Sequence, residues 1–230
     1  MSRHPGGVGG VVYRPGMVQQ SARLGVRQVD LADWRWLLGA LRARFETDSF
    51  GAGAAFVAAV GRLSDEAGHH PDVDLRAGHV QFVLRSPDVG GVTERDVQLA
   101  EQISALASDQ GLDPRPEQVQ VLEIALDTPF SETVRPFWLA VLSGGEENGE
   151  IVDPARELPL LWFQATDSTA PDRQRFHLDV TVPPEAADQR IAAAVTAGGR
   201  VVDDGRAPAF VVLADPDGNK ACVCTELGRE

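Results

Sequence analysis

The 230-residue chain is poor in cysteine, in lysine and in long apolar runs. Its two cysteines, Cys222 and Cys224, are too few for a disulfide framework, so reduced thiols are the default expectation. No stretch approaches the roughly 20 apolar residues of a membrane span, and the N-terminus has glycines where a signal peptide has its apolar segment. We therefore expect a cytoplasmic protein without a membrane partner.

Basic charge is scarce as well, because 21 lysines and arginines are outnumbered by 34 aspartates and glutamates, which gives a net charge of −13. The pI is about 4.8. Non-specific nucleic-acid binding relies on a basic surface, so this composition argues against a nucleic-acid partner. Lys220 is the single lysine, and the preference for arginine, with abundant alanine and glycine, is typical of a GC-rich bacterial genome.

Composition divides the chain into a leader, two domains and a linker. Residues 1–27 are rich in glycine and lack a sustained period, which predicts a flexible leader with Met17 as a second candidate start. Residues 28–110 have the periodicity of a folded domain. Residues 111–118 contain two prolines and predict a short stiff linker. Residues 119–230 then form a second domain, and a hydrophobic content of 43% suffices for well-packed cores in both.

The first domain is predicted to be α+β, with an antiparallel sheet that carries helices on one face. Apolar residues from Leu31 to Leu41 fall at helical spacings, which predicts a short helix running into a strand through Phe45. Gly68 occupies the position at which a glycine ends a helix. The other predicted elements are a helix over residues 50–67, strands over 72–75 and 80–84, and a helix after the capping box of Thr93 and Asp96.

A histidine pair follows the predicted helix end, in the order His69, His70, Pro71. Counting His79, three of the five histidines lie within eleven positions. An imidazole gives or takes a proton near neutral pH, so an adjacent pair at a helix exit is a candidate acid–base site. The alternative is a surface loop that holds two polar rings.

The second domain has the order of two similar modules, each a strand, a helix and several strands. Gly198 and Gly199 end the helix of the second module. Residues 215–219, with Pro216 and Gly218, predict a hairpin turn. The predicted elements cover residues 119–126, 131–142, 158–165, 176–182, 185–197, 200–202, 210–214 and 221–225.

Residues 31–107 resemble the pterin-4a-carbinolamine dehydratase family. The resemblance rests on the tryptophan-bearing first helix, on Asp65 followed after three residues by His69, His70 and Pro71, and on the downstream run from Gly90 to Asp96. It implies loss of water from a 4a-hydroxytetrahydropterin, with no required cofactor. It further implies catalytic roles for His69 and His70 and places Asp65, Pro71 and His79 as candidate substrate-binding residues.

The sequence departs from that family at three positions. The third histidine of the family falls at Pro87, which cannot transfer a proton. Two aromatic positions, which would stack on a pterin ring, are occupied by Val73 and Ala77. His79 is a candidate replacement for the missing imidazole, although it lies eight positions before Pro87. The alternative is a pterin or small-molecule binding protein that has lost its chemistry.

Residues 119–226 resemble a glyoxalase-like domain of the vicinal-oxygen-chelate superfamily, which implies a pair of βαβββ modules. Such domains usually hold a divalent metal on an open sheet. The resemblance makes Glu123 and His177 the candidate metal ligands, with Gln164 and Cys222 at the other two ligand positions. Alternatively, His177 and Glu123 are structural, and Trp162 with Phe163 lines an apolar pocket. The residues that carry the resemblance are those of 122–126, Phe137, Trp138, Leu142, 177–180, Gly198, Gly199 and 215–219.

The sequence therefore leaves three alternative functions open. The first is a histidine-based dehydratase that acts on a pterin-type small molecule. The second is a non-catalytic binding protein, and the third is a metal-dependent lyase or dioxygenase that acts through the C-terminal domain. Both resemblances are to proteins that often pair, so we also expect a homo-oligomer.

Overall fold

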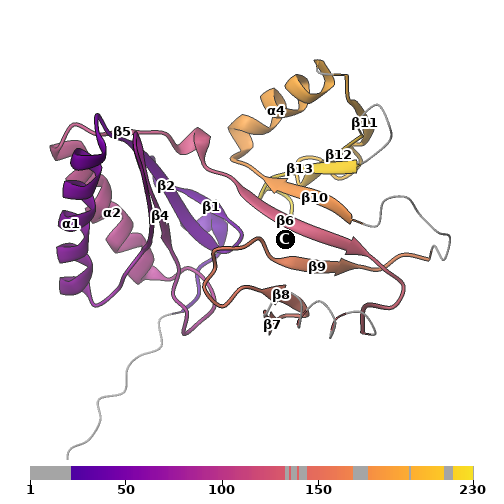
Figure 1. Cartoon of the computed structure of the whole chain (residues 1–230), viewed down its shortest axis with the longest axis horizontal. Coiled ribbons are helices and arrows are strands. Elements are labelled where there is room, and N and C mark those ends of the chain that lie inside the picture. The colour runs from indigo at the N-terminus through magenta and orange to yellow at the C-terminus, as the bar shows by residue number, and fades with distance from the viewer. Residues whose placement is uncertain are drawn as a thin grey trace, which may run out of the picture.

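The computed structural model describes residues 22–132, 135, 139, 144–167, 176–196, 198–214 and 220–229. It contains a five-stranded and an eight-stranded sheet, each built from a different half of the chain (Figure 1). This confirms the predicted α+β class and the division into two sheet-based domains. No helix among the described residues is long and apolar enough to cross a membrane.

The first sheet has the order β1-β2-β4-β3, with β5 also pairing with β2. Helices α1 and α2 cover the face that points away from the C-terminal domain (Figure 1). The segment predicted as a linker contributes β5 to this sheet. The elements are η1 (Val26–Gln28), β1 (Arg35–Leu37), β2 (Ala40–Glu46), α1 (Phe50–Ala67), β3 (Asp72–Arg76), β4 (His79–Leu84), α2 (Glu94–Asp109), β5 (Asp113–Pro114) and η2 (Pro116–Gln118).

The helix predicted between Leu31 and Leu41 is wrong. This segment forms the hairpin of β1 and β2, with Arg35 opposite Arg42. The turn residues Leu38 and Gly39 have φ values of 50° and 68°, the left-handed conformation that two-residue hairpin turns require. A leucine rarely adopts this conformation, and here its backbone N–H donates to Glu226 Oε1 at 2.8 Å.

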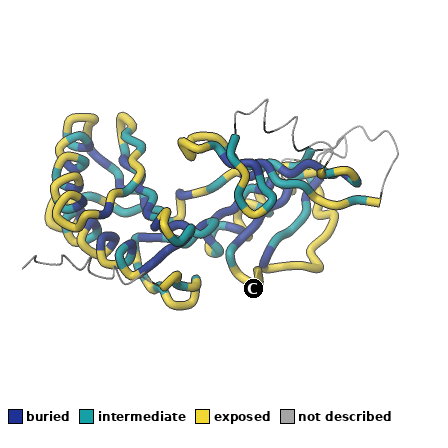
Figure 2. The backbone as a smooth tube through the Cα atoms, turned by 90° about the horizontal axis from the view of Figure 1, so that it is seen from below, coloured by how far each residue is buried: buried dark blue, intermediate teal, exposed yellow. Residues whose placement is uncertain are grey.

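The predicted helix α1 is confirmed from its first residue to its last. Ser49 caps its N-terminus by accepting from the backbone N–H of Ala52, and Gly68, with φ 61°, ends it. Its buried stripe packs on a cluster in which the rings of Phe45, Phe56 and Phe82 meet edge to face. Burial is concentrated in the strands and on the inner sides of the helices, whose outer turns are exposed (Figure 2).

The second sheet has the order β11-β12-β13-β10-β6-β9-β8-β7. Its centre pairs the first strands of the two modules, since β6 runs antiparallel to β10. The predicted helix over residues 131–142, with Phe137, Trp138 and Leu142, lies largely outside the described residues, and the predicted turn over 215–219 lies wholly outside them. The elements are β6 (Val121–Asp127), β7 (Gly145–Glu147), β8 (Glu150–Val152), β9 (Leu161–Gln164), β10 (Phe176–Thr181), α4 (Pro184–Thr196), β11 (Arg200–Asp203), β12 (Phe210–Ala214) and β13 (Lys220–Cys224).

The uncovered face of the first sheet looks toward the second domain (Figure 1). Polar contacts join the two domains. Arg35 Nε donates to Glu185 Oε1 at 2.7 Å, and Arg85 Nη2 lies 3.6 Å from Glu147 Oε2. The contact between Leu38 and Glu226 is a third link. A cleft lined by residues of both domains lies between the two sheets.

Candidate functional site

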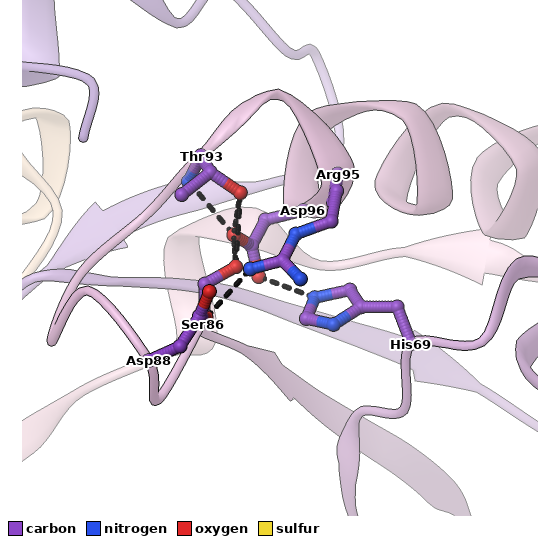
Figure 3. A network of polar contacts seen from close by, with 6 residues as sticks. All are labelled: His69, Ser86, Asp88, Thr93, Arg95 and Asp96. Carbon is purple, nitrogen blue, oxygen red and sulfur yellow. Dashed lines mark hydrogen bonds and ion pairs between the residues drawn. The ribbon is translucent and has the colours of Figure 1, made fainter. Parts of the chain in front are cut away.

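A buried histidine–aspartate pair lies where α1 exits and α2 begins (Figure 3). His69 Nε2 lies 2.7 Å from Asp96 Oδ1. His69 is 7% exposed and Asp96 is 0% exposed. The second carboxylate oxygen of Asp96 accepts from Ser86 Oγ at 2.7 Å and from Thr93 at both its backbone N–H, at 2.7 Å, and its hydroxyl, at 3.0 Å.

The sequence places Asp96 by a local rule. Thr93 and Asp96 form the predicted capping box at the start of α2, in which each residue bonds the backbone of the other. A buried carboxylate is costly unless its oxygens are satisfied, and here four donors satisfy them. The charge of Asp96 is therefore held in place, and its Oδ1 is fixed against His69.

This contact defines the state of the His69 ring. A carboxylate only accepts hydrogen bonds, so the proton of the imidazole lies on Nε2 and points at Asp96. The other ring nitrogen, Nδ1, has no hydrogen-bond partner among the residues that the structure describes, and in the neutral ring it carries a lone pair. The carboxylate of Asp96 thus fixes the orientation of the His69 ring.

His70 and Asp65 form a second, solvent-facing pair. His70 Nε2 lies 3.1 Å from Asp65 Oδ1, and the side chains are 61% and 79% exposed. The adjacent His69 and His70 thus occupy different environments, one buried and one in contact with water. Pro71 follows them at the start of β3 and lines the cleft between the domains.

His79 does not join the histidine pair. It lies at the first residue of β4, opposite Arg76 and Glu46, whereas Ser86 follows the other end of that strand. Five residues of strand separate the two ends by roughly 17 Å. Burial, together with the nearby Arg44, lowers the pKa of His79. The geometry therefore separates His79 from the site around His69.

The position of the family's third histidine lies in the turn between β4 and α2. Pro87 follows Ser86 directly, and its carbonyl accepts from the backbone N–H of Gly90 at 3.2 Å. Val73, at a position that is aromatic in the family that the sequence resembles, is 41% exposed. The candidate site residues predicted from the sequence include neither Ser86 nor Asp96. Asp96 was identified as a cap, which is the one local signal for it.

The second domain has a cavity of about 610 Å³ over the centre of its sheet. Three side chains in it offer a nitrogen, an oxygen and a sulfur atom within 4.8 Å of one another: those of His177, Asp179 and Cys222. Asp179 pairs with Cys222 on one side and with Glu123 on the other, so these three side chains form one row on one face. His177 lies in the next cross-strand row on this face, and Gln164 lies one row beyond it.

Of the predicted metal ligands, His177 lies in the group of three and Glu123 lies beside it. Asp179 is the member that was missed, although its spacing of two from His177 on a strand places both on the same face. Burial raises the pKa of Glu123 to about 7, against the opposing effect of Arg229, whose Nη1 lies 3.9 Å from Glu123 Oε2. Gln164 and Cys224 line the same cavity.

The group fits a divalent metal by its chemistry. Imidazole nitrogen, carboxylate oxygen and thiolate sulfur are all zinc ligands. Asp179 is 6% exposed, and its Oδ1 has no hydrogen bond among the described residues, since His177 Nε2 lies 3.4 Å away. Asp179 raises the pKa of His177, and burial raises that of the Cys222 thiol. A buried carboxylate oxygen without a hydrogen bond among the described residues, whose one printed contact is the 3.4 Å ion pair with His177, is an atom that a cation would satisfy.

Two family models match the chain. The model of pterin 4 alpha carbinolamine dehydratase matches residues 19–106, and that of a glyoxalase-like domain matches residues 123–224. Both predicted resemblances are confirmed by these matches. The run from Asp65 to Asp96 lies within the first, and the cavity with His177 lies within the second.

Similar proteins cover the first domain. A provisionally named pterin-4-alpha-carbinolamine dehydratase from Mycolicibacterium smegmatis is 40% identical over 80 residues, which is 35% of this chain and 85% of the relative. One from a Roseiflexus species is 39% identical over 85 residues, 37% of this chain and 91% of the relative. The crystal structure of a transcriptional coactivator/pterin dehydratase from Brucella melitensis aligns with a TM-score of 0.35 and 24% identity, over 37% of this chain and 99% of that one.

Proposed function

The chain belongs to the pterin-4-alpha-carbinolamine dehydratase family through its N-terminal domain, and we propose that this domain eliminates water from a 4a-hydroxytetrahydropterin by histidine acid–base catalysis. The observation that carries the proposal is the buried contact of His69 Nε2 with Asp96 Oδ1, which leaves Nδ1 as a free, oriented base. Dehydration requires a proton to leave a ring nitrogen of the pterin while the departing hydroxyl is protonated. Two imidazoles in different environments suit these two transfers.

The different surroundings of the two histidines support a different catalytic role for each. His69 is buried and fixed by Asp96, so it is the base that accepts the ring proton at Nδ1. His70 is exposed and close to Asp65, so it exchanges protons with water and delivers one to the departing hydroxyl. Asp65 and Pro71 are the substrate-binding candidates that lie next to this pair. His79 is too distant to take the role of the missing third histidine.

The dehydration rate of a synthetic 4a-hydroxytetrahydropterin, followed by stopped-flow absorbance, tests the proposal. We expect the full chain to accelerate the reaction and His69→Ala to lower the rate by about 100-fold or more, the usual contribution of a positioned acid–base group. His70→Ala should lower it as well. His79→Ala is the matched control, because it removes an imidazole at the far end of β4 and should leave the rate unchanged. An equal loss in all three variants would refute the assignment.

A metal site in the C-terminal domain is the second proposed function. It rests on the buried Asp179 Oδ1, which has no hydrogen bond among the described residues and lies 3.4 Å from His177 Nε2, and on the nearby Cys222. These three residues would hold a divalent ion, with Glu123 beside them. Such an ion supplies Lewis-acid polarisation of a substrate oxygen, the chemistry of a metal-dependent lyase or dioxygenase.

Zinc content measured by mass spectrometry, after loading and gel filtration, tests the metal site. We expect about one zinc ion per chain, and its loss in Asp179→Asn and Cys222→Ser. Cys224→Ser is the matched control, because Cys224 is also buried and lines the same cavity but lies outside the group of three. Zinc-free protein after loading, or equal losses in both cysteine variants, would rule the site out.

The oligomeric state of the chain and the ligand of its N-terminal domain stay predictions. We expect a homo-oligomer and a pterin-type ligand for the N-terminal domain, as the family resemblance implies. Light scattering coupled to size-exclusion chromatography measures the first, and titration with a stable dihydropterin measures the second. Pterin binding without turnover would favour the non-catalytic alternative.

A further inference from the structure

The two domains enclose a cleft of about 1030 Å³ that neither family resemblance assigns. One wall is the uncovered face of the first sheet, and the other comes from β6 and from residues 152–160 of the second domain (Figure 1). His69 and Asp96 do not line it, and Pro71 lies at its edge. The cleft exists only because the second domain lies over a sheet face that α1 and α2 leave open.

One of the residues that line this cleft is Arg42. Arg42 lies in the middle of β2, opposite Val83 on β4. It is half-buried, and its guanidinium makes no hydrogen bond or ion pair with the residues that the structure describes; its Nε is fully buried. Burial lowers the pKa of Arg42, and Asp72 on β3, on the far side of β4, opposes that effect without a direct contact. A desolvated, unpaired guanidinium is costly, and an anion would satisfy it.

A second arginine lies beside the first. Arg85 is two residues beyond Val83 on the same face, which places its Cα roughly 7–8 Å diagonally from that of Arg42. Its Nη2 lies 3.6 Å from Glu147 Oε2, while the other carboxylate oxygen of Glu147, Oε1, is bound by Arg156. The buried Nε of Arg85 also has no hydrogen-bond partner among the described residues.

Several carboxylates of the cleft are already engaged. Asp74 Oδ1 accepts from Arg76 Nε at 2.7 Å. Asp153 accepts from the backbone N–H groups of Ala155, Glu157 and Leu158, which hold its pKa below its usual value. Among the described residues, Arg42 is therefore left without a carboxylate in direct contact, and Arg85 has the 3.6 Å contact with Glu147 alone.

Apolar side chains surround the arginine pair. Leu122 and Leu158 line the cleft and are 37% and 58% exposed, and Val83, which also lines it, lies on the same sheet face as Arg42. Exposed apolar surface beside a cation is the composition of a site for an amphipathic ligand. We propose that this cleft binds an organic anion, in which a carboxylate or phosphate lies between Arg42 and Arg85 and an apolar body packs against the leucine and valine side chains.

Fluorescence titration with 1-anilinonaphthalene-8-sulfonate, an apolar organic anion, tests the site in the full chain. We expect saturable binding, weakened about tenfold or more in Arg42→Met, since a charged hydrogen bond contributes about 1.5–3 kcal/mol. N-phenyl-1-naphthylamine, the same body without the sulfonate, should bind wild type and variant equally. Arg62→Met, an exposed arginine on α1, is the matched control. Circular dichroism melting confirms that both variants fold.

Competition identifies the anionic group. Displacement of the dye by benzoate assigns a carboxylate to the site, and displacement by phenyl phosphate assigns a phosphate. Displacement by neither would overturn the proposal. Equal dye affinity of wild type and Arg42→Met would overturn it too, and so would equal weakening by Arg42→Met and Arg62→Met. Because none of these variants touches His69, His70 or Asp96, the test does not depend on the dehydratase assignment.

Discussion

Removing the carboxylate of Asp96 should destabilise the start of α2 far more than any substitution at the nearby surface does. In Asp96→Ala, four hydrogen bonds to a buried charge disappear, those from His69, from Ser86 and from the two donors of Thr93. Breaking a buried charged network by removing one partner typically costs about 3–5 kcal/mol. Part of the loss is offset, because the hydroxyls of Ser86 and Thr93 already lie 2.9 Å apart and can satisfy each other.

We therefore expect a loss of about 4 kcal/mol for Asp96→Ala, a large fraction of the stability of an ordinary domain. Asp96→Asn keeps the shape and one oxygen acceptor and should lose about 2 kcal/mol. Native-state hydrogen exchange, read by mass spectrometry on peptides from α2, measures this within the first domain alone. The two losses correspond to exchange about 1000-fold and about 30-fold faster than in wild type.

Asp88→Ala is the matched control for this experiment. Asp88 pairs with Arg95 at 2.6 Å in the same turn, but both side chains are exposed, so the pair contributes at most about 1 kcal/mol. The account of the buried network would be refuted if the α2 amides of Asp96→Ala exchanged within about threefold of the wild-type rate. It would also be refuted if they exchanged at the same rate as those of Asp88→Ala.

Three further predictions follow from the structure. Pro87→His restores an imidazole beside Ser86 and should raise the dehydration rate about tenfold or more in the stopped-flow assay; an unchanged rate would mean that the position is not part of the site. Glu123 has a folded-state pKa of about 7, raised from its ordinary value of 4.5, so its contribution to stability is fully present below pH 4.5 and is lost as the pH rises through 7. Urea unfolding of metal-free protein should show a loss on the order of 3 kcal/mol over this range that Glu123→Gln removes, and a variant with the same pH dependence as wild type would contradict the burial argument. Gly68→Ala should cost about 1–2 kcal/mol, because alanine strains at φ 61° although open space surrounds the position; a melting temperature equal to that of wild type would be inconsistent with the left-handed helix end.

The fold was largely predictable where one period dominates a segment. Phe50–Ala67 and Phe210–Ala214 have the predicted bounds, since an apolar stripe or an alternating run is closed by a glycine or a turn. The hairpin at Leu38 and Gly39 was not predictable in this way. The tight turn interrupts the alternation of buried and exposed residues between the two strands. As a result Trp34, Leu37 and Leu41 are all buried, at spacings of three and four residues that an amphipathic helix would also give.

The sites were predictable only in part, because local patterns do not reveal which distant side chains meet. The pattern identified His69 as a candidate and Asp96 as a helix cap, but the contact between them joins residues 27 positions apart. His79 is nearer to His69 in sequence and yet lies at the other end of β4. In the second domain, the pairing of β10 with β13 brings Asp179 to Cys222, a register that follows from the assembled sheet.

The most direct test of the central claim is the first-order rate constant for dehydration of a 4a-hydroxytetrahydropterin, measured in buffer and with increasing amounts of the full chain, both in the presence of EDTA. The account predicts a rate that rises in proportion to protein concentration and is insensitive to the chelator, because the proton transfers belong to His69 and His70 in the N-terminal domain. A rate equal to that of buffer would contradict it. A rate that EDTA abolishes would also contradict it, since the activity would then depend on a metal.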